Sequence, residues 1–138
     1  MDVDNFVGSW RLVSQHSLYP DGRTFPSRGD GADGILMYDA NGMMAVQLVR
    51  TDQHAALFRN IATLDTSLKG FLAYFGWYEV VESAQEVHHY VQRSSYPGFV
   101  GRTLIRTYRF EADRLVLTAK SPTDESVREL AWARIQPT

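Results

Sequence analysis

The sequence predicts a mainly β protein in which eight strands form an antiparallel up-and-down barrel, with a short helical insert at about residues 52–74. Two observations support this fold class. Eight segments rich in aromatic and β-branched residues follow one another with short connections. Helical spacing of apolar residues is confined to the insert, so strands and helices do not alternate as in βαβ units. With 138 residues, the chain is expected to form a single domain over residues 1–138.

Composition narrows the classes of function. The chain has no cysteine, which excludes a disulfide framework and thiolate chemistry. Its formal net charge of −2 shows no basic excess for nucleic acid, and no apolar run approaches the roughly 18 residues of a membrane helix. The opening residues MDVDNFVGSW lack the basic and long apolar regions of a signal peptide. We therefore expect a soluble, cytoplasmic protein with no membrane or nucleic-acid partner.

Three strand candidates precede the insert, at residues 10–19, 35–39 and 43–50. A Pro-Asp-Gly turn and a loop rich in glycine and aspartate separate the first from the second. Between the second and third, Asn41-Gly42 favours the positive φ angles of a tight hairpin turn. In the first strand, side-chain alternation predicts this inner face: Trp10, Leu12, Ser14, His16 and Leu18.

The insert at residues 52–74 is expected to contain two short helices. Apolar residues recur there at three- and four-residue spacings, and Asp65 can cap the second helix. Gly70 near the end of that helix weakens it by about 1 kcal/mol relative to alanine. The insert either lies across one end of the barrel as a lid, with Phe58 facing the cavity, or fills the hydrophobic core.

The stretch from residue 71 to residue 93 has the highest aromatic density and is read as a helix end followed by a hairpin with strands at 75–81 and 86–93. Alternation places one of the two adjacent histidines, His89, on the inner face with Val87, Val91 and Arg93, and His88 on the outer face. The remaining strand candidates are residues 103–111, 114–119 and 126–134.

Gly8-Ser9-Trp10, at the start of the first strand, resembles the G-x-W signature that opens the lipocalin barrel. Further segments extend the likeness over nearly the whole chain: GILMYDANGMMAVQLVR, AYFGWYEV, VHHYVQRS, YPGFVGRTLIR and LAWAR. Together they resemble the bacterial and fungal lipocalin-like domain family, of the calycin type. The resemblance implies a barrel with a central cavity that holds small organic molecules, and it implies no particular reaction. The insert in mid-chain and the absence of disulfides differ from secreted lipocalins and argue against extracellular transport.

The resemblance also has implications for the two ends of the barrel. The tryptophan of the signature, Trp10, is expected at the closed end, where the segment around Phe6 covers it. A late-strand arginine, Arg106 or Arg134, is expected to stack on Trp10. The open end is then expected near Tyr19, the loop of the 20s, Arg50 and the insert.

Inner-face positions and strand ends supply the candidate ligand-binding residues: His16, Gln47, Arg50, Phe58, Trp77, Tyr78, His89, Arg106, Tyr108 and Trp132. A buried Arg106 needs a carboxylate, backbone carbonyls, an aromatic face or a ligand anion. A neutral His89 beside Tyr78 and Tyr108 is able to transfer protons inside an apolar cavity, although a core histidine with satisfied hydrogen bonds is the plainer interpretation.

The sequence has no metal-ligand spacing such as HxH or HExxH, no P-loop, no G-x-S-x-G and no dinucleotide fingerprint, so no metal site and no cofactor are predicted. The first functional hypothesis is a barrel that binds a small, largely hydrophobic molecule, aromatic or polyketide-like. The alternative is a cofactor-free isomerase, cyclase or hydratase of secondary metabolism, with His89 as the acid/base and Tyr78 or Arg106 stabilising negative charge. A third is a structural or interaction domain, assembled as a homodimer through barrel faces or the insert.

Overall fold

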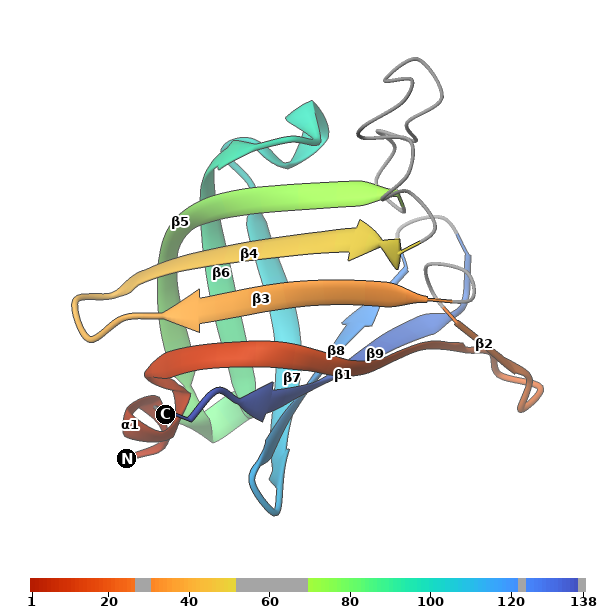
Figure 1. Cartoon of the computed structure of the whole chain (residues 1–138), viewed down its shortest axis with the longest axis horizontal. Coiled ribbons are helices and arrows are strands. Elements are labelled where there is room, and N and C mark those ends of the chain that lie inside the picture. The colour runs from red at the N-terminus through yellow and green to blue at the C-terminus, as the bar shows by residue number, and fades with distance from the viewer. Residues whose placement is uncertain (27–30, 52–69, 122–123, 137–138) are drawn as a thin grey trace.

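The structure is a computed structural model that describes residues 1–26, 31–51, 70–121 and 124–136. Its described residues form one antiparallel sheet in the order β2-β1-β3-β4-β5-β6-β7-β8-β9, and β1 also pairs with β9 (Figure 1). This pairing closes the sheet into an eight-stranded barrel, to which the short β2 adds an edge. The elements are α1 (Asp2–Phe6), β1 (Gly8–Leu18), β2 (Thr24–Phe25), β3 (Ala32–Tyr38), β4 (Met43–Arg50), β5 (Phe71–Val81), β6 (Glu86–Ser94), β7 (Thr103–Glu111), β8 (Arg114–Lys120) and β9 (Val127–Arg134), with 3-10 turns η3 (Glu82–Ala84) and η4 (Pro97–Phe99).

The predicted barrel and all eight of its strands are confirmed, including the hairpin at Asn41-Gly42, where Gly42 has a φ of +93°. The predicted end of the insert is wrong. Residues 71–74 belong to β5, because Leu72 and Tyr74 pair with Leu48 and Val46 of β4 and point into the barrel. Residues 52–69 of the insert, including Phe58, lie outside the described residues.

The predicted inner face of the first strand is wrong beyond Leu12. A bulge lies between Leu12 and Ser14, where the register against β9 shifts by one residue. A one-residue shift moves the following side chains to the opposite face. Gln15 is therefore buried, whereas His16 lies outside the barrel and is exposed.

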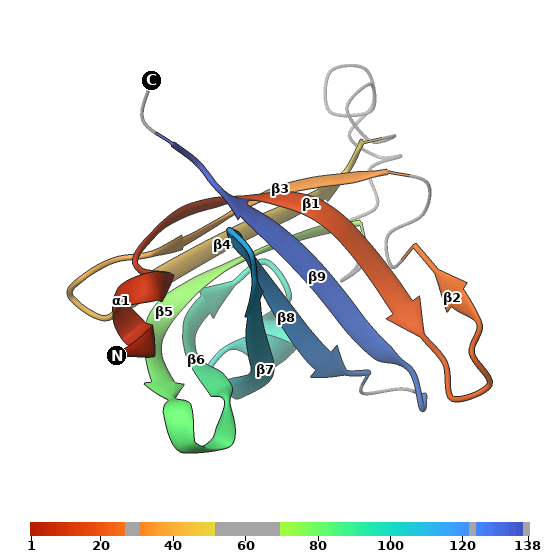
Figure 2. The same ribbon diagram turned by 90° about the horizontal axis from the view of Figure 1, so that it is seen from below.

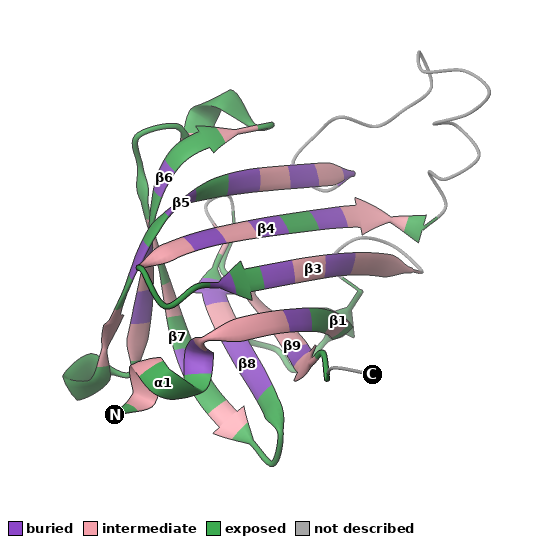
Figure 3. Cartoon of the chain, turned by 60° about the vertical axis from the view of Figure 1, so that its left-hand side comes forward, coloured by how far each residue is buried: buried purple, intermediate pink, exposed green. Residues whose placement is uncertain are grey.

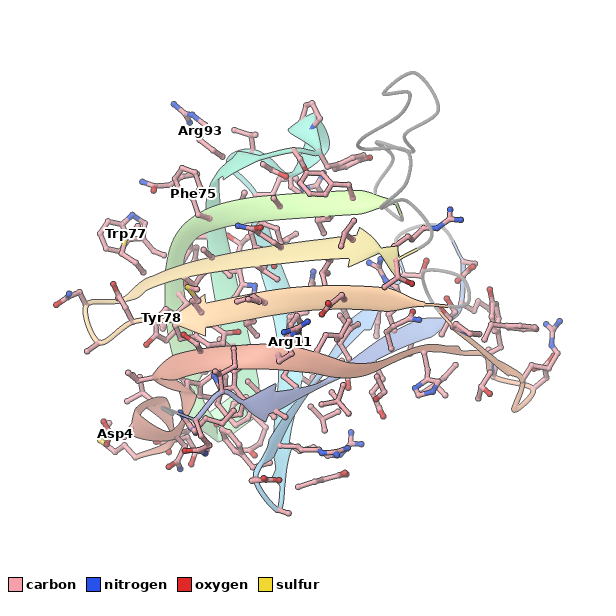
Figure 4. All side chains as sticks on the ribbon, viewed as in Figure 1. Asp4, Arg11, Phe75, Trp77, Tyr78 and Arg93 are labelled. Carbon is pink, nitrogen blue, oxygen red and sulfur yellow. The ribbon has the colours of Figure 1, made fainter. Side chains whose placement is uncertain are left out.

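A second bulge has the same consequence in the central hairpin. The pairing of β5 with β6 shifts between Phe75 and Gly76, so that Gly76 lies opposite Val91 and Phe75 opposite Arg93. The predicted inward positions of His89 and Val91 are confirmed, but Arg93 lies on the outer surface with Phe75 (Figure 4). Along β4 and β5, buried positions otherwise alternate with more accessible ones, as a barrel wall requires (Figure 3).

The α1 end of the barrel is closed, as the resemblance implied. Helix α1 lies across this end (Figure 2), and Trp10 donates a hydrogen bond from Nε1 to the Phe6 carbonyl at 2.9 Å. The guanidinium of Arg134 lies over the Trp10 ring at 4.3 Å and donates to the carbonyls of Val7 and Asn5 at 2.7 and 2.6 Å. Gly8 has a φ of +138°, and a Cβ there would lie 2.6 Å from Nη1 of Arg134. The glycine of the G-x-W signature thus leaves room for the arginine that covers its tryptophan.

Candidate functional site

A cavity of about 60 Å³ lies inside the barrel, toward the end opposite α1. Apolar side chains from most of the barrel strands form the greater part of its wall: Leu36, Val46, Leu48, Leu72, Leu117, Ala119 and Leu130, with Phe99 from η4. Five side chains with polar groups complete it: Tyr74, His89, Arg106, Arg128 and Trp132. An apolar wall with a few convergent polar groups is the usual composition of a small-molecule site.

His89 lies between two tyrosine hydroxyls. Its Nε2 is 2.7 Å from the Tyr38 hydroxyl and its Nδ1 is 2.6 Å from the Tyr74 hydroxyl, and the side chain is only 2% exposed. Burial lowers the pKa of His89 well below its usual 6.5, and the charges of Arg106 and His88 lower it further. A neutral imidazole has one donor and one acceptor nitrogen, so one tyrosine donates to the ring and the other accepts from it.

Two arginines, Arg106 of β7 and Arg128 of β9, reach the cavity from neighbouring parts of its wall. Within the described part of the chain, neither forms an ion pair with a carboxylate. Among the described residues, Arg106 donates only to the carbonyl of Ile105, at 3.2 Å. Burial and then the charge of Arg106 lower the pKa of Arg128, while Tyr74 and Asp124 raise it. Because an arginine stays protonated even so, the cavity wall contains two positive charges.

Trp132 is a third donor in the wall. Its side chain is 1% exposed, and its Nε1–H has no hydrogen-bond acceptor among the described residues. An indole N–H can only donate, and a buried donor without a partner costs about 1–3 kcal/mol. The Trp132 side chain lines the cavity, and its N–H is buried within the wall.

A groove of about 220 Å³ adjoins the cavity on the outside of the barrel. The two share three wall residues: Phe99, Arg106 and Arg128. The groove adds Arg102 and Lys120 to these, together with Tyr96, Gly98, Thr103 and Leu104. The boundary between cavity and groove is thus formed by one aromatic ring and two guanidinium groups.

Five of the predicted site residues point into the barrel. His89, Arg106 and Trp132 line the cavity. Tyr78 and Tyr108 instead belong to the packed α1 end: the Tyr78 hydroxyl donates to the Asp39 carbonyl at 2.7 Å, and the Tyr108 hydroxyl donates to Oδ2 of Asp2 at 2.5 Å. The predicted cluster of His89 with Tyr78 and Tyr108 is therefore wrong, since the hydroxyls on His89 come from Tyr38 and Tyr74.

Four other predicted site residues that the structure describes do not line the cavity, and Phe58 lies outside the described residues. His16 and Gln47 are exposed on the outer face, and Trp77 is 47% exposed there (Figure 4). Arg50 is the last residue of β4 and lies on the same face of the strand as Leu48, but it does not line the cavity. Arg106 does not stack on Trp10, because Arg134 occupies that position.

Sequence reasoning missed three polar or aromatic residues of this region. Arg128 shares the face of Leu130 and Trp132, so alternation along β9 was a sufficient signal for it. Tyr38 and Tyr74 were harder to find, because Tyr74 was assigned to a helix and Tyr38 lay next to a turn.

Comparisons with known proteins identify the family of this chain. A family model described as a lipocalin-like domain matches residues 7–135. Crystal structures of two mutants of the fluorescent protein UnaG are similar at 13% sequence identity. The first covers 96% of this chain and 97% of its own with a TM-score of 0.45, and the second 98% and 99% with a TM-score of 0.46. A search of curated proteins found no match. The family model spans nearly the whole chain, and the chain belongs to the lipocalin-like domain family.

Proposed function

We propose that the protein binds a small, largely hydrophobic organic molecule in the barrel cavity. The observation that carries the proposal is the cavity wall, which is mostly apolar yet includes two arginines that form no ion pair with a carboxylate among the described residues. A barrel that served only as a scaffold would be expected to fill this space with side chains, as the α1 end does.

The size of the cavity limits what can occupy it. A protein cavity of about 150 Å³ is known to hold benzene. A cavity of about 60 Å³ accepts a slender group such as an alkyl chain, and the rest of a ligand must continue past Phe99 into the groove. We therefore expect an elongated ligand with an apolar end inside the barrel.

Isothermal titration calorimetry with 1-octanol, a neutral molecule of this shape, tests the proposal. We expect saturable binding with one molecule per chain. Ala119 lines the cavity, and an Ala119→Leu substitution would fill the space with an isobutyl group. This variant should bind 1-octanol at least about tenfold more weakly, which corresponds to about 1.4 kcal/mol, with an unchanged or slightly raised melting temperature.

Ala45→Leu is the matched control, because Ala45 lies on the outer side of β4 opposite Met37 and Phe75. It adds the same side chain without touching the cavity and should leave binding unchanged. Equal binding by the Ala119→Leu variant, or no saturable binding by the unmodified protein, would contradict binding in the cavity.

The hydrogen-bonded chain Tyr74–His89–Tyr38 favours one second candidate, the cofactor-free isomerase, cyclase or hydratase. Both nitrogens of His89 are engaged, so a proton from a ligand would reach the imidazole through the Tyr74 hydroxyl, which lines the cavity. Deuterium exchange into 2-octanone, followed by NMR in heavy water, measures such proton abstraction next to a carbonyl. Catalysed exchange that is lost in Tyr74→Phe would support the enzyme, and exchange at the uncatalysed rate would leave only binding.

Three further predictions concern assembly, location and partners. The homodimer, the cytoplasmic location and the absence of a nucleic-acid partner stay predictions, and light scattering in solution tests the first. In the described ranges, no helix is long and apolar enough to cross a membrane.

A further inference from the structure

We propose that the ligand is a hydrophobic organic acid whose anionic group binds to Arg106 and Arg128 at the boundary between the cavity and the groove. This inference rests on the proposed function and names the chemical class of the ligand. Its apolar chain would occupy the leucine-lined cavity, and its carboxylate would lie where the two guanidinium groups meet the groove.

The first argument is the comparison of the arginines on the late strands. Arg134 is satisfied within the protein, because it covers Trp10 and donates to two backbone carbonyls. Arg106 has a single bond to a neighbouring carbonyl, and Arg128 has no hydrogen bond or ion pair within the described ranges. Only the first of the three has a structural role that accounts for its charge.

The second argument is the repulsion between Arg106 and Arg128. The charge of Arg106 lowers the pKa of Arg128, which means that the two guanidinium groups are close enough to disfavour each other. Partly buried like charges without a counterion are unfavourable. A bound carboxylate would remove this repulsion and accept charge-assisted hydrogen bonds from both groups.

The third argument is the match between a carboxylate and the two arginines. A carboxylate provides acceptor oxygens only, and the guanidinium groups of Arg106 and Arg128 in the cavity wall provide donors only. A neutral alcohol or ketone would leave the two arginines without an anionic partner.

The groove extends the positive region outward. Arg102 and Lys120 line it together with the two cavity arginines, and none of the described residues of its wall is acidic. A cleft lined by one sign of charge attracts ligands of the opposite sign. The charge of Asp124 raises the pKa of Arg128, but this carboxylate accepts hydrogen bonds from the backbone N–H and hydroxyl of Ser126 and from the Tyr19 hydroxyl and forms no ion pair with a described arginine.

The test compares octanoate with 1-octanol by isothermal titration calorimetry at about pH 7, where a carboxyl group is ionised. The two molecules have the same carbon number and differ in the charge of the head group. We expect octanoate to bind at least about tenfold more tightly, as charge-assisted hydrogen bonds predict.

Arg106→Gln and Arg128→Gln should each weaken octanoate binding by about tenfold or more and change 1-octanol binding by less than about twofold. Arg93→Gln is the control, because it removes the same charge from the outer surface (Figure 4). Melting curves verify that each variant is folded. The comparison of octanoate with 1-octanol on the unmodified protein tests the inference without any variant.

The outcomes separate this inference from the proposed function. Tight binding of 1-octanol with no preference for octanoate would overturn the inference and leave the proposed function standing. Octanoate binding that survives both arginine substitutions would also overturn it. If neither molecule binds, or if Ala119→Leu blocks neither, the cavity itself is not the site and both proposals fail.

Discussion

The two halves of the barrel use the same types of residue for different purposes. At the α1 end, Trp10, Tyr78, Tyr108 and Arg134 have hydrogen-bond partners within the chain. Phe6 fills the space among the rings, in edge-to-face contact with the aromatic rings of Tyr38, Tyr108 and Phe110. In the cavity half, the corresponding tryptophan and arginines are Trp132, Arg106 and Arg128, and they line empty space.

The difference lies in the hydrogen-bond partners and not in the composition. Trp10 and Trp132 are equally buried, but in the part of the chain that the structure describes only Trp10 has an acceptor for its indole N–H. Buried polar groups that are satisfied stabilise a fold, and those left unsatisfied at a cavity are suited to a ligand. We therefore expect substitutions in the α1 half to change stability, and those in the cavity half to change binding.

Trp10→Ala should have the largest effect on stability. It empties a fully buried site between α1 and the barrel and should lower the free energy of unfolding by about 3–5 kcal/mol. Affinity for 1-octanol should stay unchanged where the variant is folded. Denaturant titration measures the loss, and Trp77→Ala on the outer surface, with an expected change within about 0.5 kcal/mol, is the control. A Trp10 variant that lost affinity as well would show that the two halves are coupled.

Arg134→Gln and Arg128→Gln form a matched pair. Loss of the cation–π contact and of two charged hydrogen bonds at Arg134 should cost about 2 kcal/mol. Removal of the uncompensated charge at Arg128 should leave the free energy of unfolding unchanged or slightly higher. Thermal unfolding of the two variants under the same buffer conditions makes the comparison. A larger loss at Arg128 would assign it a structural role and weaken the contrast.

His89 should make stability depend on pH. Its pKa in the folded protein is lower than in the unfolded chain, so the unfolded chain takes up the proton first as the pH falls. The neutral His89 therefore contributes fully to the free energy of unfolding above about pH 6.5. Below that pH its contribution decreases by up to about 1.4 kcal/mol per pH unit. Unfolding free energies measured between about pH 7 and pH 5 should show this slope, and His89→Gln should remove that part of it. An unchanged slope in the variant would contradict a buried neutral histidine.

Trp132→Phe should have the smallest effect on stability, and the sign is the informative part. Phenylalanine retains most of the apolar contact but has no N–H to leave unsatisfied, so a small loss of packing is offset by up to about 1 kcal/mol. The net change in the free energy of unfolding should lie within about 1 kcal/mol of zero. Trp10→Phe is the control, since it also leaves the Phe6 carbonyl without its donor and should cost more. Equal losses at the two positions would mean that the Trp132 donor has a partner.

The sequence alone was sufficient for the barrel, for its closed end and for three residues of the cavity wall. Strand periodicity, the Asn41-Gly42 turn and the G-x-W signature are local features, and each determines a local structure in the same way in almost any context. Inward placement of His89 and Arg106 followed from alternation within strands that have no irregularity before them, and Trp132 was a candidate for the wall or the mouth.

Two kinds of feature required the tertiary structure. The bulges in β1 and between β5 and β6 have no distinctive residue type, yet each turns the side chains beyond it, so His16 and Arg93 were placed on the wrong face. Leu72 and Tyr74 fitted helical spacing as well as alternation, and only pairing with β4 places them in a strand.

Tertiary structure also decided which arginine stabilises the fold and which are left at the cavity. Alternation gives the face of a strand on which a side chain lies, but not its height along the barrel axis or its neighbours on other strands. Arg134 is level with Trp10 because those two residues pair across β1 and β9, and that pairing is established only when the sheet closes. Arg106 and Arg128 lie nearer the other end, where neither forms an ion pair with a carboxylate among the described residues, and we infer that their charge is available to a ligand.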